Sequence, residues 1–177
     1  MFSVRVFQSS SSCQIGPMTL LLGIVIGLFL FVVLRVALHH LLLFKLRRDV
    51  AALNAGNHRP LLAGYAQDAV LVFTEGDHRW SGTYVGRDAI GEFLEGFMRC
   101  GIQGEITELW TGGWPWALTI LVGFDDHADG PHGERLYENH TVLVCRTRWG
   151  KIVRQEDFYV DTVRMIAFDR KLTELGI

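Results

Sequence analysis

The most constraining feature of this 177-residue chain is an uncharged apolar run near its N-terminus. In residues 18–34, MTLLLGIVIGLFLFVVL, 13 of 17 positions are Leu, Ile, Val or Phe. About 20 helical residues, each rising about 1.5 Å, cross the roughly 30 Å of hydrocarbon in a bilayer, and the uncharged stretch 15–34 supplies them. Continuation of the helix through residue 44 would permit a tilt. Residues 15–44 are therefore expected to form one transmembrane anchor helix, with the lipid bilayer as its partner.

The sequence around this run favours an anchor over a cleaved signal peptide. A signal peptide has a shorter apolar core followed by a small-residue cleavage site, whereas Arg35 and bulky residues follow here. Three basic residues lie within 45–48 against Arg5 alone before the run, so the positive-inside rule places the C-terminal part in the cytoplasm. The Ser-rich residues 1–14 show no periodic pattern and are expected to be a disordered tail. Translation could also start at Met18.

The charge balance excludes one class of function. Residues 1–49 carry five basic side chains and one acid, whereas residues 50–177 carry 12 basic and 18 acidic side chains. Nucleic-acid binding depends mainly on Lys and Arg that neutralise phosphates, so no nucleic-acid partner is expected. The three cysteines, Cys13, Cys100 and Cys145, are far apart and lack metal-ligand spacing. Neither a disulfide framework nor a metal site is therefore expected.

Beyond the anchor, residues 45–177 show the element order of an α+β domain. An apolar helical face at 46–53 comes first, followed by a β-branched strand at 69–74 and an amphipathic helix from Arg87. Four strand-like runs then follow one another directly, and a helix ends the chain. Because consecutive strands favour antiparallel pairing, we expect a curved antiparallel sheet with helices packed on one face.

Three motifs in this domain resemble the nuclear transport factor 2-like superfamily, and within it the SnoaL-like group. They are LLAGYAQDAVLVF, GTYVGRDAIGEFL and RWGKIVRQEDFYVDT, in that order and followed by a terminal helix. The resemblance implies a cone-shaped sheet around a pocket for a small hydrophobic molecule, without a cofactor. The superfamily includes ketosteroid isomerase, limonene epoxide hydrolase and polyketide cyclases beside members that only bind partners, so the fold does not decide the reaction. Many members pair through their sheets, which leaves a homodimer open.

The catalytic residues of these relatives map onto this sequence only in part. Counted from Tyr65, the base of ketosteroid isomerase falls on Phe73, and a phenyl ring cannot take a proton. The Arg-x-Asp pair of the epoxide hydrolase is replaced by Glu-Asn-His-Thr at 138–141. The acid on the last strand of the cyclases and the hydrolase is matched by Asp157. The resemblance thus implies Asp157 as the acid/base and disfavours ketosteroid-isomerase and epoxide-hydrolase chemistry.

Strand alternation places Asp157 on the same face as Tyr159. In an apolar cavity, desolvation would raise the pKa of Asp157 toward neutrality, where the group can donate or accept a proton. His140 on the preceding strand is predicted to be its acid/base partner, with Glu138 fixing the tautomer. The alternative is structural: an arginine holds the Asp157 carboxylate, and His140 is a hydrogen-bonded wall residue. Asp161 is predicted to cap the last helix.

The expected ligand pocket is lined by aromatic and polar side chains from several elements. They are Tyr65, Phe73, Trp80, Trp110, Trp116, Glu138, Asn139 and Tyr159. The tryptophans would suit a flat apolar ligand, but they would equally well fill the cone as core. Two functions stay open. One is cofactor-free lyase, isomerase or cyclase-like chemistry on a lipophilic molecule of polyketide or steroid type. The other is a non-catalytic ligand-binding or assembly module at the membrane surface.

Overall fold

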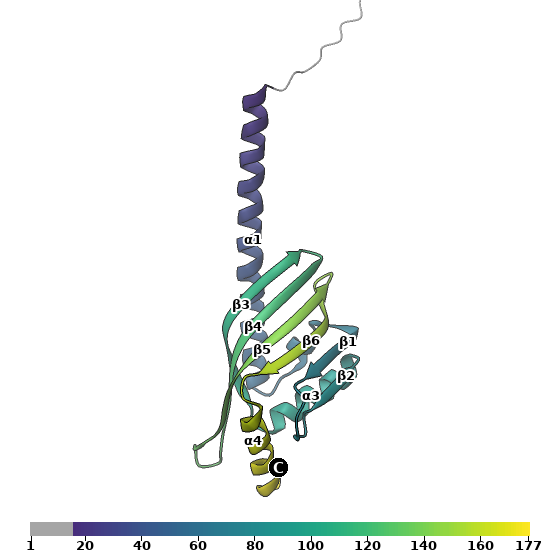
Figure 1. Ribbon diagram of the computed structural model, residues 1–177, viewed down its shortest axis with the longest axis vertical. Helices are drawn as coiled ribbons and strands as arrows, with labels where there is room; N and C mark the ends of the chain where they lie inside the picture. The colour runs from purple at the N-terminus through teal and green to yellow at the C-terminus, as the bar shows by residue number, and fades with distance from the viewer. Residues whose placement is uncertain (1–15) are drawn as a thin grey trace, which may run out of the picture. The chain divides into compact units, whose positions relative to one another are not determined.

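The computed structural model describes residues 16–177, which fall into two units (Figure 1). The first unit ends at His40, and the second runs from Leu41 to Ile177. The predicted disordered tail 1–14 lies outside the described residues.

Helix α1 (Pro17–Asn54) forms the described part of the first unit and continues into the second. Every residue from 16 to 34 is exposed. The helix is long and apolar enough to span a membrane. The sequence divided this stretch into an anchor ending at residue 44 and a separate helix. Instead, a single helix runs to Asn54, because residues 35–54 contain no glycine or proline that would interrupt it.

The second unit contains three further helices and six strands. In chain order they are α2 (Arg59–Leu62), β1 (Tyr65–Phe73), β2 (Gly82–Val85), α3 (Arg87–Arg99), β3 (Gln103–Trp114), β4 (Ala117–Asp129), β5 (Arg135–Arg148), β6 (Lys151–Tyr159) and α4 (Thr162–Glu174). The strands form one sheet in the order β2-β1-β6-β5-β4-β3. Figure 1 shows this sheet curving around the helices.

The α+β class with a curved sheet is confirmed, but the sheet is mixed rather than wholly antiparallel. Strands β3 to β6 follow one another through short turns and pair antiparallel, as predicted. Strand β6 then pairs parallel to β1 on its other side. The two strands are separated by most of the domain's sequence, so no short turn dictates their relative direction. Sequence adjacency predicts only the pairs that a turn joins.

The helices cover the concave face of the sheet and form the hydrophobic core with it. One core cluster joins β1 to α3 and α4, with Phe73, Phe93 and Phe168 among its buried members. A second cluster contains Val50 of α1, packed with buried side chains of β3 and β4. Asp161 caps α4 as predicted, because its Oδ1 accepts a hydrogen bond from the Arg164 amide at 3.1 Å. The core therefore leaves the middle of the concave face for a cavity.

Candidate functional site

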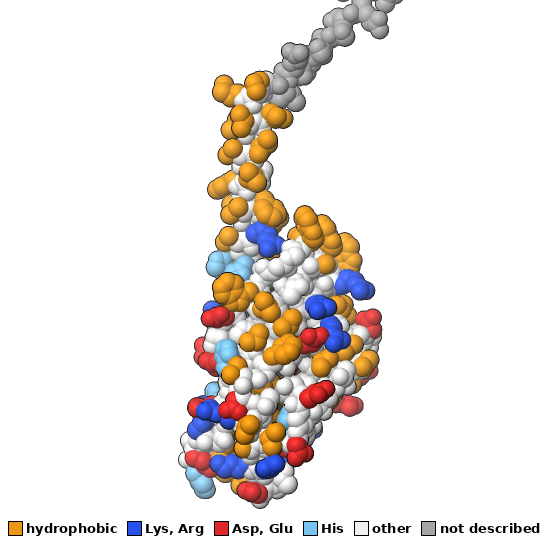
Figure 2. Space-filling model, viewed as in Figure 1, with side chains coloured by type: hydrophobic (Ala, Val, Ile, Leu, Met, Phe, Trp, Pro, Cys, Tyr) orange, Lys and Arg blue, Asp and Glu red, His pale blue; other side chains and the backbone are white. Residues whose placement is uncertain are grey.

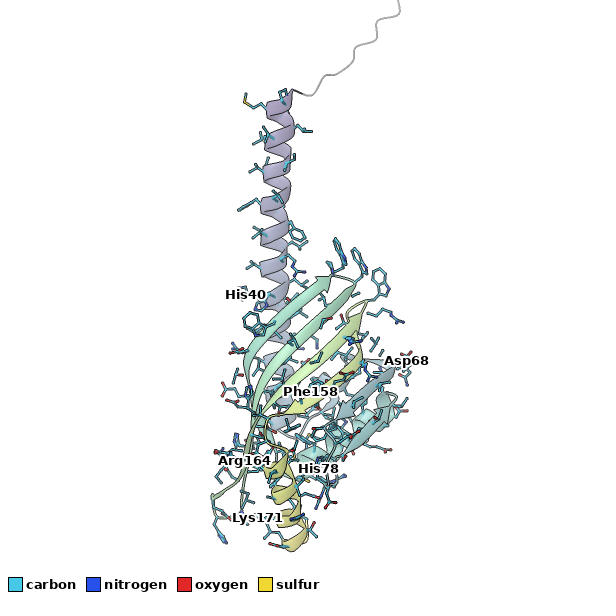
Figure 3. All side chains as sticks on the ribbon, viewed as in Figure 1. His40, Asp68, His78, Phe158, Arg164 and Lys171 are labelled. Carbon is cyan, nitrogen blue, oxygen red and sulfur yellow. The ribbon has the colours of Figure 1, made fainter. Side chains whose placement is uncertain are left out.

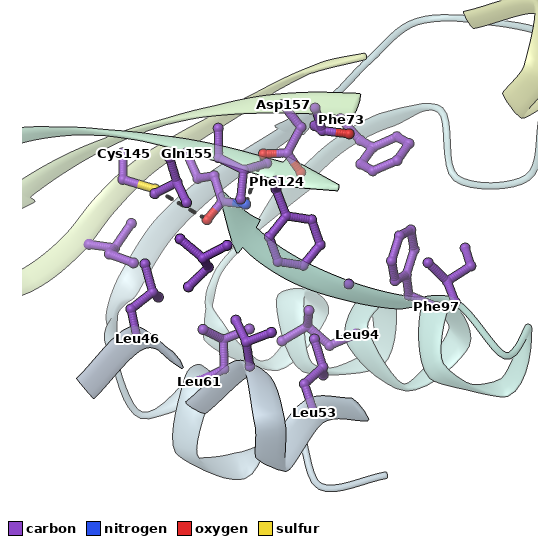
Figure 4. Close-up of a pocket in the computed structure, with 18 of the residues that line it drawn as sticks. Leu46, Leu53, Leu61, Phe73, Leu94, Phe97, Phe124, Cys145, Gln155 and Asp157 are labelled. Carbon is purple, nitrogen blue, oxygen red and sulfur yellow. Dashed lines mark hydrogen bonds between the residues drawn. The ribbon is translucent and has the colours of Figure 1, made fainter. Parts of the chain in front are cut away.

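A cavity of about 120 Å³ lies between the sheet and the helices of the second unit (Figure 4). Its helical side includes Leu46, Val50 and Leu53, the three side chains whose spacing predicted an apolar face on this part of α1. The sheet side carries most of the polar groups, including Gln155 and Asp157. Figure 4 shows these two residues on the sheet, opposite leucines of the helices. The cavity is therefore apolar, with its polar groups gathered on one wall.

The side chain of Asp157 is held by a short chain of hydrogen bonds. Its Oδ1 accepts a bond from Gln155 Nε2 at 2.8 Å. The other end of the Gln155 amide, Oε1, accepts from the Tyr65 hydroxyl at 2.5 Å and from Cys145 Sγ at 3.5 Å. Because both partners donate to Oε1, the NH₂ group of Gln155 must point at Asp157. This arrangement fixes one carboxylate oxygen of Asp157, Oδ1.

Burial controls the protonation of Asp157. The residue is only 7% exposed, and desolvation raises the pKa of its carboxyl to about 7. The hydrogen bond from Gln155 lowers this pKa in part, whereas the nearby Asp126 carboxylate raises it. Among the ion pairs of residues 16–177 none involves Asp157, and Arg154 pairs with Glu156 instead. The arginine-held alternative is therefore not what the structure shows, and Asp157 can gain or lose a proton near neutral pH.

A second buried carboxyl, Asp126 of β4, was missed by the sequence argument. It is 2% exposed, and its Oδ2 accepts a hydrogen bond from the Tyr137 hydroxyl at 3.0 Å. Burial raises the pKa of Asp126 to about 7, with hydrogen bonds from Tyr137, Tyr159 and Thr141 lowering it in part. The charged run at 125–134, with Gly130-Pro131 and Gly133, is typical of a solvated hairpin turn and was predicted as one, but β4 extends through Asp129. Asp126 is in phase with the apolar positions of β4, and that alternation was the available signal.

His140 does not form the predicted pair with Asp157. Leu143 lies opposite Asp157 in the β5–β6 register, so Asp157 shares a face with the odd-numbered residues of β5, and His140 lies on the other face. Its Nδ1 is 2.5 Å from Asp125 Oδ1, and 46% of its side chain is exposed. Phe158, on the same outer face, is also exposed (Figure 3). The predicted acid/base pair of Asp157 and His140 is therefore wrong: Asp157 is a buried acid, and His140 lies on the outer face of the sheet.

Glu138 and Asn139 also lie outside the cavity, in a surface depression beside His140. Glu138 is exposed and its carboxylate contacts Arg164. The Asn139 amide donates to the backbone carbonyl of Asp161 at 2.7 Å and accepts from the Asp161 amide at 3.2 Å. Asn139 thus ties β5 to the start of α4, which is a structural role.

The aromatic residues expected in the pocket separate into two groups. Tyr65, Phe73 and Tyr159 do line the cavity. The three tryptophans do not. Trp80 is buried but stacks on Phe168, with ring centroids 5.8 Å apart. Trp110 and Trp116 are 63% and 49% exposed, because Trp110 lies on the face of β3 that pairs with exposed Leu121 and Trp116 lies in the turn after β3.

Comparisons with solved structures identify the fold of the second unit. No protein-family model matches the chain, and no curated protein does. Among solved structures, Bal32a from a soil-derived mobile gene cassette has a TM-score of 0.61 at 19% identity, covering 71% of this chain and 94% of that one. A nuclear transport factor 2-like protein of unknown function from Burkholderia pseudomallei has a TM-score of 0.57 at 21% identity, covering 72% and 95%. The second unit has the nuclear transport factor 2-like fold.

Another structure with similarity to this chain is TerC co-crystallised with polyporic acid, with a TM-score of 0.54, 21% identity and coverage of 69% of this chain and 92% of that one. At such identities the nuclear transport factor 2-like fold is shared and the chemistry is not thereby fixed. No group of three or more metal-ligating side chains is found among residues 16–177. The function must be argued from the cavity itself.

Proposed function

We propose that the second unit binds a small, mainly apolar molecule in its cavity, with Asp157 as the hydrogen-bonding partner of the molecule's polar group. The observation that carries this proposal is a buried carboxyl, held through Oδ1 by Gln155, on the polar wall of a mainly apolar cavity. A buried carboxyl costs stability unless hydrogen-bonding partners satisfy its oxygens. A ligand with one hydroxyl or carbonyl group would supply one such partner.

The volume of the cavity limits the size of the ligand. About 120 Å³ is close to the roughly 150 Å³ of an engineered apolar cavity in another protein that binds benzene. It is well below the roughly 300 Å³ at which cavities begin to enclose drug-sized ligands. A ligand with a single ring therefore fits better than the polyketide- or steroid-sized molecule suggested by the sequence resemblance.

The proposal includes a membrane anchor. Helix α1 is long and apolar enough to cross a bilayer, and the basic residues at 45–48 favour a cytoplasmic position for the second unit. Apolar ligands partition into lipid, so an anchored domain meets them at a raised local concentration. The co-crystal of TerC with polyporic acid supports the more general point that this fold can hold a small organic molecule.

The test is to fill the cavity without altering the rest of the sheet. Leu143→Phe adds volume to a residue that lines the cavity, whereas Val142→Phe adds it one position away on the opposite face of β5. Phenol and cyclohexanone should raise the melting temperature of the full chain in detergent micelles for the wild type and for Val142→Phe, but not for Leu143→Phe. Equal shifts in all three proteins would place binding elsewhere and contradict the proposal.

A second candidate function, cofactor-free acid/base catalysis, is favoured by one further observation. Burial raises the pKa of both Asp157 and Asp126 to about 7, and the Asp126 carboxylate contributes to the rise at Asp157. A carboxyl with such a pKa can remove a proton from carbon next to a carbonyl group and return it to another atom. If so, the full chain will exchange the α-hydrogens of cyclohexanone for deuterium faster than Asp157→Asn does. Equal exchange in the two proteins would contradict catalysis by Asp157, and ligand binding would then be the sole proposed function.

A further inference from the structure

Four of the five tryptophans lie exposed near two neighbouring turns of the sheet. Trp110, Trp114 and Trp116 belong to β3 and the β3–β4 turn, and Trp149 to the β5–β6 turn. Their exposed fractions are 63%, 63%, 49% and 78%, in that order. We call these four residues the tryptophan patch. Figure 2 shows hydrophobic side chains gathered at this end of the sheet. An exposed apolar group of this size marks a contact surface rather than ordinary variation.

Contacts between the two turns hold the patch together. The rings of Trp114 and Trp116 are stacked, with centroids 5.4 Å apart and planes 9° from parallel. The Trp149 amide donates a hydrogen bond to the Trp116 carbonyl at 2.9 Å. Three of the rings are therefore presented by backbone that is already ordered, so contact with a partner would cost little conformational entropy.

Trp149 has a backbone conformation that the fold alone would not select for tryptophan. Its φ is +50°, and among residues 16–177 it is the sole non-glycine residue with positive φ. This region is unfavourable for residues with a Cβ and is usually occupied by Gly, Asn or Asp in hairpin turns. Because the ring is also the most exposed of the four, neither backbone nor packing explains a tryptophan there.

Basic side chains accompany the patch. Arg146 and Arg148 lie near the end of β5, next to Trp149, and both are exposed. Neither takes part in any ion pair found among the described residues 16–177. Lys151, at the start of β6, is exposed as well and donates to the Ala63 carbonyl. Tryptophan beside Lys and Arg is the composition that suits the boundary of a bilayer, where the rings lie at headgroup level and the cations meet phosphate groups.

The chain enters the second unit at the same end of the sheet. The Asn54 side chain, at the end of α1, forms two hydrogen bonds with the Gly104 backbone at the beginning of β3. Leu43, earlier on the helix, and Leu109, farther along β3, both pack against the same buried cluster. Within this unit α1 thus runs antiparallel to β3, and its entry end corresponds to the end of β3 that carries the tryptophans. The apolar run 18–34 comes shortly before that entry in sequence.

We propose that the tryptophan patch docks on the headgroup layer of a lipid bilayer. This inference rests on the anchor in the proposed function and adds to it a second, peripheral contact that orients the domain. A second copy of this chain is the competing occupant. The unpaired arginines favour lipid phosphates, because two identical patches would bring like charges together.

The natural fluorescence of the full chain tests this inference. Residues 1–79 contain no tryptophan, so all emission comes from the second unit. The chain is reconstituted into phosphatidylcholine–phosphatidylglycerol vesicles, with and without bromine on the lipid chains near the headgroup. Bromolipid should quench the emission by about half, since interfacial tryptophans lie at headgroup depth. Trp80→Phe should keep that quenching. A variant with serine at all four patch positions, leaving Trp80 alone, should lose it.

Flotation of the same vesicles separates failure of this inference from failure of the anchor. A chain that floats with the vesicles but emits equally with and without bromolipid would overturn docking and leave the anchor intact. A chain that does not float would overturn both. Emission that instead shifts to the blue as the number of chains per vesicle rises, without bromolipid quenching, would assign the patch to a second copy and overturn lipid docking. Ligand-induced melting shifts are independent of all three outcomes.

Discussion

Three buried side chains dominate the electrostatics at the scale of single residues, and they act in opposite directions. Asp126 and Asp157 have raised pKa values because burial disfavours their charged forms. His78 has a lowered pKa for the same reason, since its charged form is the protonated one. Neither ring nitrogen of His78 has a hydrogen-bond partner within the described part of the chain. The folding stability therefore depends on pH through each group, in one direction for the two aspartates and in the opposite direction for His78.

For Asp157, stability is expected to fall as pH rises. The folded pKa of about 7 lies above the ordinary value of 3.8, so the folded state binds the proton more tightly. The contribution is complete below pH 3.8 and is lost as pH rises through about 7. Asp157→Asn keeps a neutral side chain and should flatten this dependence by a few kcal/mol. Urea unfolding of the full chain in micelles, followed by circular dichroism across this range, measures it. Parallel pH profiles for the two proteins would contradict a buried Asp157.

For His78, stability is expected to fall as pH decreases. The folded pKa is below the ordinary value of 6.5, so the unfolded chain takes up the proton first and gains from acidification. His78→Leu removes both unpaired nitrogens and should make the protein less sensitive to acid below about pH 6.5. Thermal melting of the two proteins between neutral and mildly acidic pH is the measurement. A variant that melts earlier at every pH, with an unchanged slope, would show that the histidine ring matters only for packing.

At the scale of elements, α1 and β3 meet at Asn54 and Gly104 and both line the cavity. Strand alternation predicted correctly that Asp157 and Tyr159 share a face, and helical spacing predicted the side of α1 that covers them. The partner of Asp157 could not be predicted this way. Alternation describes each strand alone, whereas the register decides which face of β5 meets Asp157, and that register places His140 outside. The buried role of Asp126 was hidden by the charged residues around it, which made a strand look like a turn.

Gly104 in β3 provides a test of the packing at this side of the cavity. A Cβ added there would lie 2.0 Å from the Phe124 ring, which lines the cavity. Gly104→Ala should therefore push the ring aside, lower the free energy of unfolding by about 1–3 kcal/mol and weaken phenol binding. Gly112→Ala on the same strand meets nothing within 4 Å and is the matched control. Urea unfolding and phenol-induced melting shifts of both variants measure the effect. Equal stability in the two would show that this contact is loose.

At the scale of the whole molecule, the chain combines a helix able to span a bilayer with a domain that has the nuclear transport factor 2-like fold. Both were accessible from sequence, because a long uncharged run and several ordered motifs are strong signals. The exposure of the tryptophans was not, since hydrophobicity argues for burial, although the strand-like runs of the sequence already break at Gly113-Trp114-Pro115 and at Trp149-Gly150. Their exposure could be interpreted only once the structure showed their positions in the sheet. The cavity volume could also be obtained only from the structure, and it reduces the expected size of the ligand to about one ring.

The protonation of Asp157 in its cavity is the property on which both proposed functions depend, and nuclear magnetic resonance measures it directly. The full chain in nanodiscs is labelled with ¹³C at the aspartate carboxyl carbons and titrated, with Asp157→Asn identifying the signal. The account predicts that this carboxyl titrates near pH 7, and that adding cyclohexanone perturbs its signal. A carboxyl that titrates near pH 4, as an exposed aspartate does, and ignores the ketone would contradict the account.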